Sequence, residues 1–128
     1  MKLLLDTHSF LWFISGSDRI SITARGLIED SSNQPLLSIA SLWEMAIKVS
    51  IGRLKLARPF EELIPEQMSL NGIEVLDIQM EHVAEVVELP FHHRDPFDRL
   101  LIAQAKVEGT PIVGADEKFD AYTITRMW

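Results

Sequence analysis

The chain has 128 residues, of which 47% are apolar and 24% charged, which is the size and composition of one ordinary globular domain. It contains no cysteine, and this excludes disulfide bonds, thiolate zinc sites and a thiol nucleophile. Its 12 Lys and Arg against 19 Asp and Glu give a formal net charge of −7, so the overall field repels phosphate backbones unless some of the acids bind cations.

The apolar opening of the chain is short. Asp6 and His8 interrupt it, and no run of 18 or more uncharged apolar residues follows, so we expect neither a signal peptide nor a membrane span. No repeat, low-complexity tract or linker divides the chain. We therefore expect a single cytoplasmic domain over residues 1–128 that makes no contact with a membrane.

Short apolar strands alternate with helical segments along the sequence. In chain order, the expected elements are a strand at 2–5, helices at 9–14 and 21–30, a strand at 35–38, helices at 41–51 and 59–70, a strand at 73–76, helices at 81–89 and 96–108, a strand at 111–113 and an edge strand at 122–125. Strands that alternate with helices indicate βαβ units. The predicted fold is α/β, a three-layer α/β/α sandwich with a central, mainly parallel sheet of four to five strands.

Four acidic residues stand at the ends of apolar stretches spread over nearly the whole chain: Asp6, Glu44, Asp98 and Asp116. Asp6 directly follows the first strand and Asp116 lies three residues past Val113, so both belong to the carboxyl rim of a parallel sheet, where ligands bind. Glu44 and Asp98 lie in first turns of helices that could start there. Carboxylates gathered at one rim repel by about 4 kcal/mol per pair at about 4 Å and an effective dielectric near 20, and a divalent cation is the simplest remedy.

Each acid also has a purely structural interpretation. Glu44 fits a capping box that starts at Ser41. Asp95 fits a helix cap, with Asp98 at the positive end of the helix dipole, and Asp116 could open a short turn.

Asp6 is harder to explain without a partner, because a carboxylate that closes a buried strand must be paired. The structural alternatives also do not predict that all four acids fall at one end of a sheet. The joint pattern therefore favours a metal site, and its hard oxygen ligands suit Mg²⁺ or Mn²⁺ better than zinc.

The four histidines contribute little to this site in the sequence analysis. His92 and His93 are adjacent and are expected to be exposed loop residues, with substrate contact as the alternative. His8 could approach the rim beside Asp6, although packing on a helix face is the simpler role, and His82 is expected at a surface position of a helix.

Four segments of the chain resemble the motifs of the PIN domain family, and specifically its VapC-type toxins of bacterial toxin–antitoxin systems. They are LLLDTH at residues 3–8, SIASLWEMAIK at 38–48, HRDPFDRLLIAQA at 93–105 and IVGADEKF at 112–119. The resemblance spans residues 1–128, so it identifies the whole chain as one PIN domain, and the third motif is the most specific. It implies a compact α/β/α fold and a ribonuclease that depends on Mg²⁺ or Mn²⁺.

The resemblance places the acidic quartet of the family on Asp6, Glu44, Asp98 and Asp116, as catalytic residues and metal ligands, with Asp95 as an accessory acid. One departure is Gly114, which stands where many relatives have a hydroxyl residue, so that a hydrogen bond to the site is lost.

The expected chemistry is hydrolysis of an RNA phosphodiester by a water that the cation activates. Asp6 and Asp98 are expected to be the main metal anchors, whereas Glu44 either binds the ion, directly or through water, or acts as general base. The basic residues expected to bind the RNA backbone are Arg94, Arg99, Lys48 and Arg53. The alternative role for Lys48 is only an ion pair with Glu44 four residues earlier, and the alternative for Arg99 is only solvation of a helix face.

Partners are also implied. The helix at 41–51 is apolar on most faces and, with Leu11, Trp12 and Phe13, suggests a protein-binding groove or a dimer contact; a well-buried core helix is the alternative. The family resemblance implies a homodimer and a cognate antitoxin that lays a peptide across the groove. The main alternative function is a non-catalytic, PIN-like protein-interaction scaffold.

Overall fold

Five strands form one sheet in the computed structural model, which describes residues 1–128. The strands are β1 (Lys2–Leu5), β2 (Gln34–Ser38), β3 (Glu74–Leu76), β4 (Ile112–Val113) and β5 (Arg126–Met127). Their order is β3-β2-β1-β4-β5, and every pair is parallel. The predicted α/β class and parallel sheet are confirmed. The edge strand was predicted at residues 122–125, which is wrong, because the chain first turns through the 3₁₀ helix η1 (Glu117–Ala121) and pairs only at Arg126.

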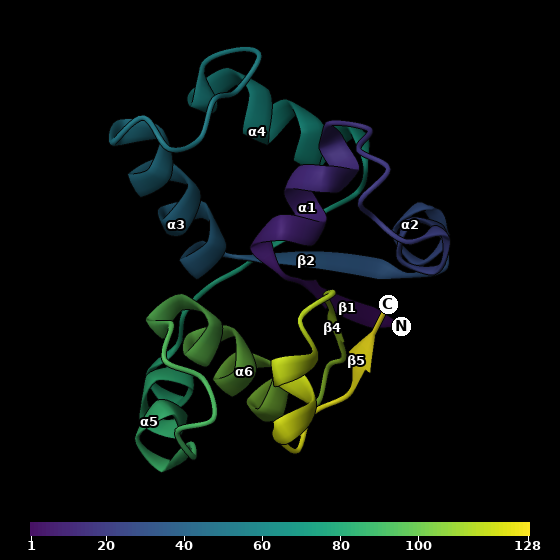
Figure 1. Cartoon of the computed structure of the whole chain (residues 1–128). Helices are drawn as coiled ribbons and strands as arrows, with labels where there is room; N and C mark the ends of the chain where they lie inside the picture. Colours follow the sequence, from purple (N-terminus) through teal and green to yellow (C-terminus); the bar gives the residue numbers. More distant parts are fainter.

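Helices cover both faces of the sheet. They are α1 (Thr7–Ile14), α2 (Ile22–Glu29), α3 (Ile39–Ser50), α4 (Phe60–Leu70), α5 (Met80–Glu88) and α6 (Pro96–Glu108). Figure 1 shows α1, α2, α3 and α4 on one side of the strands and α5 and α6 on the other. No helix has both the length and the apolar character needed to cross a bilayer.

The central strand β1 supplies both halves of the core, because successive side chains of a strand point to opposite faces. Leu3 and Leu5 pack with Phe10 of α1 on one face, and Leu4 packs with Ile102 of α6 on the other; all five are fully buried. A strand that is buried on both faces is expected to be a continuous apolar run. In β1 this apolar run consists of three buried leucines, and the carboxylate of Asp6 follows it directly.

The strand order reverses between β1 and β4. The chain first moves from β1 through β2 to β3, and later returns to place β4 and β5 on the other side of β1. In open parallel sheets, a crevice forms at the carboxyl ends of the two strands that flank such a switch point. Asp6 follows β1 and Gly114 follows β4, so these two residues lie at that crevice.

A buried polar network ties the carboxyl end of β2 to α6. The hydroxyl of Ser38, the N-cap of α3, donates to Oε1 of Gln104 (2.5 Å), and Nε2 of Gln104 donates to the carbonyl of Asp77 (3.3 Å). Ser38 and Gln104 are fully buried. The network connects Ser38, at the end of β2, and Asp77, just after β3, to Gln104 of α6. It therefore fixes where α6 lies relative to the sheet.

His82 belongs to the same interior, so its predicted surface position is wrong. The side chain is fully buried between α5 and α6. Nδ1 accepts the amide hydrogen of Gln79 (2.9 Å) and Nε2 lies 3.1 Å from Oε2 of Glu108. A polar ring can occupy this apolar interior because both of its nitrogens have partners.

We predict that Gln104→Leu lowers the free energy of unfolding by about 1–3 kcal/mol, because the hydroxyl of Ser38 and the carbonyl of Asp77 lose a buried partner. Urea denaturation measures the change. The matched control is Gln67→Leu on α4. Oε1 of Gln67 accepts only a long, part-buried hydrogen bond from Asn71 (3.5 Å), so this substitution should change stability by less than about 0.5 kcal/mol. Equal effects of the two substitutions would contradict the role of the network.

Candidate functional site

Asp6 connects β1 to α1 and is only 6% exposed. Its amide donates to the carbonyl of Val113 in β4 (3.0 Å), and its Oδ1 caps α1 by accepting the amide hydrogen of Ser9 (2.7 Å). Burial raises the pKa of Asp6 above its ordinary value, and the hydrogen bonds from Ser9 only partly oppose this effect. The cap fixes one carboxylate oxygen and leaves Oδ2 to face the switch point.

Gly114 makes room for this second oxygen. A Cβ atom at position 114 would lie 2.7 Å from Oδ2 and 3.1 Å from Cγ of Asp6, and 3.3 Å from the ring of Phe119. Any side chain at this position would therefore displace the carboxylate of Asp6. The glycine that departs from the family pattern is thus a condition for the observed position of Asp6.

Glu44 lies in the middle of α3 and is also buried, at 6% exposure. Its Oε1 accepts a hydrogen bond from the hydroxyl of Thr7 (2.7 Å), and its Oε2 lies 3.0 Å from Nζ of Lys48. The predicted capping box is wrong: the helix starts earlier, with Ser38 as its N-cap, and Ser41 is an internal residue of α3. The structure contains the ion pair between Lys48 and Glu44.

Two acids begin α6. Asp95 is its N-cap, and Oδ1 accepts the amide hydrogens of Phe97 (2.8 Å) and Asp98 (3.2 Å). Burial, followed by the negative charge of Asp95, raises the pKa of Asp98 to about 7, and the charges of Glu44 and Asp6 add to the effect. The carboxylates of three separate elements are therefore close enough to repel one another.

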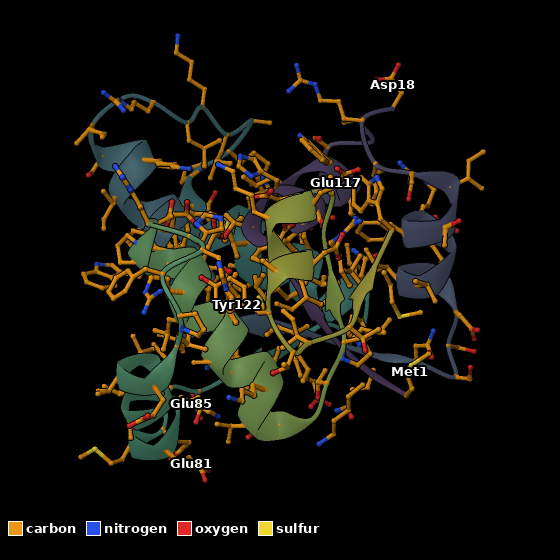
Figure 2. All side chains as sticks on the ribbon, turned by 60° about the horizontal axis from the view of Figure 1, so that its bottom comes forward. Met1, Asp18, Glu81, Glu85, Glu117 and Tyr122 are labelled. Atoms are coloured by element: carbon orange, nitrogen blue, oxygen red, sulfur yellow. The ribbon has the colours of Figure 1, made fainter.

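Asp116 completes the group through His93. Asp116 caps η1, with Oδ1 accepting the amide hydrogen of Lys118 (2.9 Å). Nε2 of His93 lies 3.2 Å from Oδ2 of Asp116 and 3.1 Å from Oδ2 of Asp98. Although partial burial raises the pKa of Asp116, the hydrogen bonds from Lys118 and His93 lower it below its ordinary value. Figure 2 shows Glu117, the neighbour of Asp116, at one end of η1.

His93 was predicted to be an exposed loop residue, and this is wrong. Its side chain is 9% exposed, and its ring stacks on Phe119 with centroids 5.9 Å apart. The nitrogen and oxygen atoms of His93, Asp98 and Asp116 form a group within 4.8 Å of one another. Asp6 and Glu44 stand outside that group, although their charges act on Asp98.

The four basic residues predicted to bind RNA differ in their surroundings. Arg94 and Arg53 are exposed, and Lys48 is half-buried beside Glu44. Arg99 is 5% exposed, and its guanidinium donates to the carbonyls of Pro90, Leu89, Val86 and His93 at 2.9–3.5 Å. The structure contradicts the prediction for Arg99, because its N–H groups already donate to backbone carbonyls of α5 and of the loop before α6.

A groove of about 410 Å³ opens beside the acidic residues, between α1, α3 and the chain that follows α3. Its wall is mostly apolar and includes Leu11, Trp12 and Leu54, with Lys48 and Arg53 among the basic residues at its rim. Leu11, Trp12 and Phe13 are half-buried. Leu11 and Trp12 line the groove, whereas Phe13 packs against the hydrophobic core.

Three residues that the sequence analysis passed over support the acids. Thr7 holds Glu44, Ser9 holds Asp6, and His93 joins Asp98 to Asp116. Ser9 lies three residues after Asp6, and a carboxylate at a strand end that also begins a helix would have signalled its amide as the cap partner. The contact of Thr7 with Glu44 has no such signal, because it joins residues 37 positions apart. His93 has no comparable local signal, because its contact with Asp116 joins residues 23 positions apart.

The sequence matches the family model of the PIN domain over residues 3–124. The chain is similar to Ribonuclease VapC16 of Mycobacterium tuberculosis (strain ATCC 25618 / H37Rv), with 35% identity over 60 residues, which are 47% of this chain and 43% of that protein. The matched stretch therefore spans less than half the length of this curated relative.

Solved structures share the fold over nearly the whole chain. The crystal structure of VapBC2 from Rickettsia felis bound to a DNA fragment from their promoter aligns with a TM-score of 0.73 and 16% identity, covering 99% of this chain and 98% of that chain. DNA-bound VapBC from Salmonella typhimurium aligns with a TM-score of 0.70 and 16% identity, covering 99% and 97%. At this identity, the likeness shows the fold.

We predict that Asp98→Asn stabilises the metal-free protein, and more so at pH 8 than at pH 5. The carboxyl titrates near pH 7 when folded and near about 3.9 when unfolded, so the folded state binds the extra proton and the wild type loses stability as pH rises between these values. Above pH 7 the free energy of unfolding of the variant should exceed that of the wild type by at least about 1 kcal/mol. Urea denaturation in EDTA at both pH values measures it, and a gain that does not depend on pH would contradict the assignment. Asp18→Asn, in an exposed loop, is the control.

We predict that Gly114→Ala destabilises the protein by about 1–3 kcal/mol, because the new methyl group overpacks the carboxylate of Asp6. The control is Gly26→Ala within α2, where a Cβ meets nothing within 4 Å and removal of a helical glycine should stabilise by about 0.5–1 kcal/mol. Thermal unfolding in EDTA compares the two variants. A neutral Gly114→Ala would show that Asp6 has room to move.

Proposed function

The chain belongs to the PIN domain family, and from that premise we propose that it is a divalent-metal-dependent endoribonuclease, the toxin of a toxin–antitoxin pair. The supporting observation is the gathering of acids at the carboxyl end of the sheet, where Asp98 and Asp116 both contact Nε2 of His93 and the pKa of Asp98 is raised by burial and by the charges of neighbouring acids. The similarity to a ribonuclease supports the reaction class, and the likeness to toxin–antitoxin complexes supports the biological setting.

The residues fit a hard divalent cation. The donors are carboxylate oxygens without any sulfur, which suits Mg²⁺ or Mn²⁺. Asp6 is held so that Oδ2 faces a space that a side chain at position 114 would fill. Asp6 and Asp98 would hold the ion, with Glu44 and Asp116 as further ligands. Asp95 is an accessory acid whose Oδ1 already caps α6.

The proposed reaction is hydrolysis of an RNA phosphodiester. When bound, a divalent cation supplies Lewis-acid chemistry, since it lowers the pKa of a water and offsets negative charge on the phosphoryl oxygens. Thr7 fixes Oε1 of Glu44 and Lys48 pairs with Oε2, so Glu44 would be free to accept a proton at Oε2 once Lys48 moves away. Lys48, with a side chain 36% exposed, can then turn from Glu44 to a substrate phosphate.

The proposed RNA contacts are Lys48, Arg53 and Arg94. All three reach solvent, and Lys48 and Arg53 share one groove, so phosphates could follow this side of the acidic group. Because the chain carries a net charge of −7, such local cations are needed to attract a polyanion. Binding should then weaken as salt rises.

The groove of about 410 Å³ is the proposed docking place for a cognate antitoxin. Its apolar wall favours a segment with apolar side chains, and the basic residues Lys48, Arg53 and Lys55 favour acidic groups beside them. A segment bound there would lie next to Lys48 and, through it, next to Glu44. Inhibition would then result from blocking the approach of RNA to the acids.

A homodimer is proposed through the exposed side of α3 and α5. Trp43 of α3 is 61% exposed, and Val87 of α5 and Phe91 just after it are 81% and 83% exposed. Exposed apolar side chains mark an interaction site where they form one contiguous patch, and the proposal is that these three meet in such a patch. The apolar helix of the sequence analysis thus turns one side to the core and another to solvent.

We predict that Asp6→Asn lowers the rate of RNA cleavage by at least about 100-fold and leaves the protein folded, because the change removes a buried negative charge and preserves the cap of α1. Cleavage of a labelled RNA is measured with Mg²⁺, Mn²⁺ or EDTA in protein free of contaminating nuclease. Asp18→Asn is the control and should cleave like the wild type.

Two outcomes would contradict the proposal. Cleavage that persists in EDTA or in Asp6→Asn would exclude these acids as the site of chemistry. A wild-type protein that neither cleaves RNA nor changes its melting temperature with cations would instead support the non-catalytic scaffold.

A further inference from the structure

We infer that His93 is a positioning residue of the metal site: its Nε2–H group holds the carboxylates of Asp98 and Asp116 toward each other, and the ring itself is not a ligand. The inference rests on the proposed function and adds a residue outside the acidic group. It follows from the contacts of the two ring nitrogens, and from the groups that hold the ring.

The position of His93 is determined by contacts on three sides. Its ring stacks on Phe119, with the planes inclined by 24°. Its carbonyl accepts a hydrogen bond from the buried guanidinium of Arg99 (3.5 Å). The loop before it is held by Tyr122, whose hydroxyl donates to the carbonyl of Pro90 (2.9 Å). Tyr122 follows η1 on the side that faces α6 (Figure 2).

The hydrogen bonds select one tautomer of His93. Nδ1 accepts the amide hydrogen of Asp95 (3.3 Å), so Nδ1 carries no proton and the ring proton is on Nε2. Nε2 lies 3.1 Å from Asp98 and 3.2 Å from Asp116, and both contacts are with acceptors. A nitrogen that carries a proton has no lone pair for a metal ion, so the ring acts here as a donor.

This donor leaves one oxygen of Asp98 free. His93 contacts Oδ2 of Asp98 and Oδ2 of Asp116, and Oδ1 of Asp116 accepts from Lys118. Oδ1 of Asp98 has no hydrogen-bond partner in the protein. The hydrogen bond between Nε2 and Asp116 and the 3.1 Å contact of Nε2 with Oδ2 of Asp98 thus leave Oδ1 of Asp98 for an ion, in the way that contacts outside the ligand set orient metal ligands. Asp98 and Asp116 come from different elements, and His93 is the side chain that joins them.

The test is a calorimetric titration of the full-length protein with Mn²⁺. His93→Ala should bind Mn²⁺ about 10–100-fold more weakly than the wild type. His93→Gln keeps an amide N–H donor in place of Nε2–H but lacks the imidazole, so it should bind nearly as well as the wild type. His92→Ala is the matched control, because this neighbour is exposed, and it should bind like the wild type.

Each other outcome overturns the inference in a different way. If His93→Gln is as weak as His93→Ala, the imidazole nitrogen is itself a ligand. If His93→Ala binds like the wild type while Asp98→Asn does not bind, the histidine has no role at the site and the proposed function stands. If the wild type binds no Mn²⁺, the proposed function fails together with the inference. Circular dichroism establishes that each variant is folded.

Discussion

The repulsion among buried carboxylates at the junction of β1 and β4 is the constraint on which the rest of this site depends. Burial together with neighbouring negative charges raises the pKa of Asp98 to about 7, and burial raises that of Asp6. Such an arrangement lowers the stability of the fold, since burial of a charged carboxylate is unfavourable. Strongly perturbed groups that share a crevice are typical of functional sites.

The structure shows how the fold offsets the unfavourable burial of these carboxylates. Asp6, Asp95 and Asp116 are N-caps, of α1, α6 and η1. In each of these, Oδ1 accepts amide hydrogens at the positive end of a helical segment, which stabilises the negative charge. Structural and functional interpretations of these acids are therefore compatible, because Oδ1 caps in each, while Oδ2 of Asp6 faces the switch point and Oδ2 of Asp116 is held by His93. Asp98 and Glu44 have no cap role, and the pKa of Asp98 is raised to about 7.

The sequence predicted the sheet and α6 well, because apolar runs and the Asp95-Pro96 start are strong local signals. The acids were recognised as one group since parallel strands end at one rim. The errors share a cause, which is contact between distant residues. Arg99 was taken for a surface cation, yet it binds carbonyls of the preceding loop, and His82 and His93 are buried by partners on other elements. The close approach of Gly114 to Asp6 likewise depends on the pairing of β1 with β4, which no local pattern encodes.

The central claim is that these carboxylates share one divalent cation, and anomalous diffraction from crystals soaked in Mn²⁺ tests it most directly. The account predicts a peak at the manganese edge between Asp6 and Asp98, absent from crystals of Asp6→Asn. Saturating Mn²⁺ that gives no peak beside these two side chains, or a peak that persists in Asp6→Asn, would contradict it.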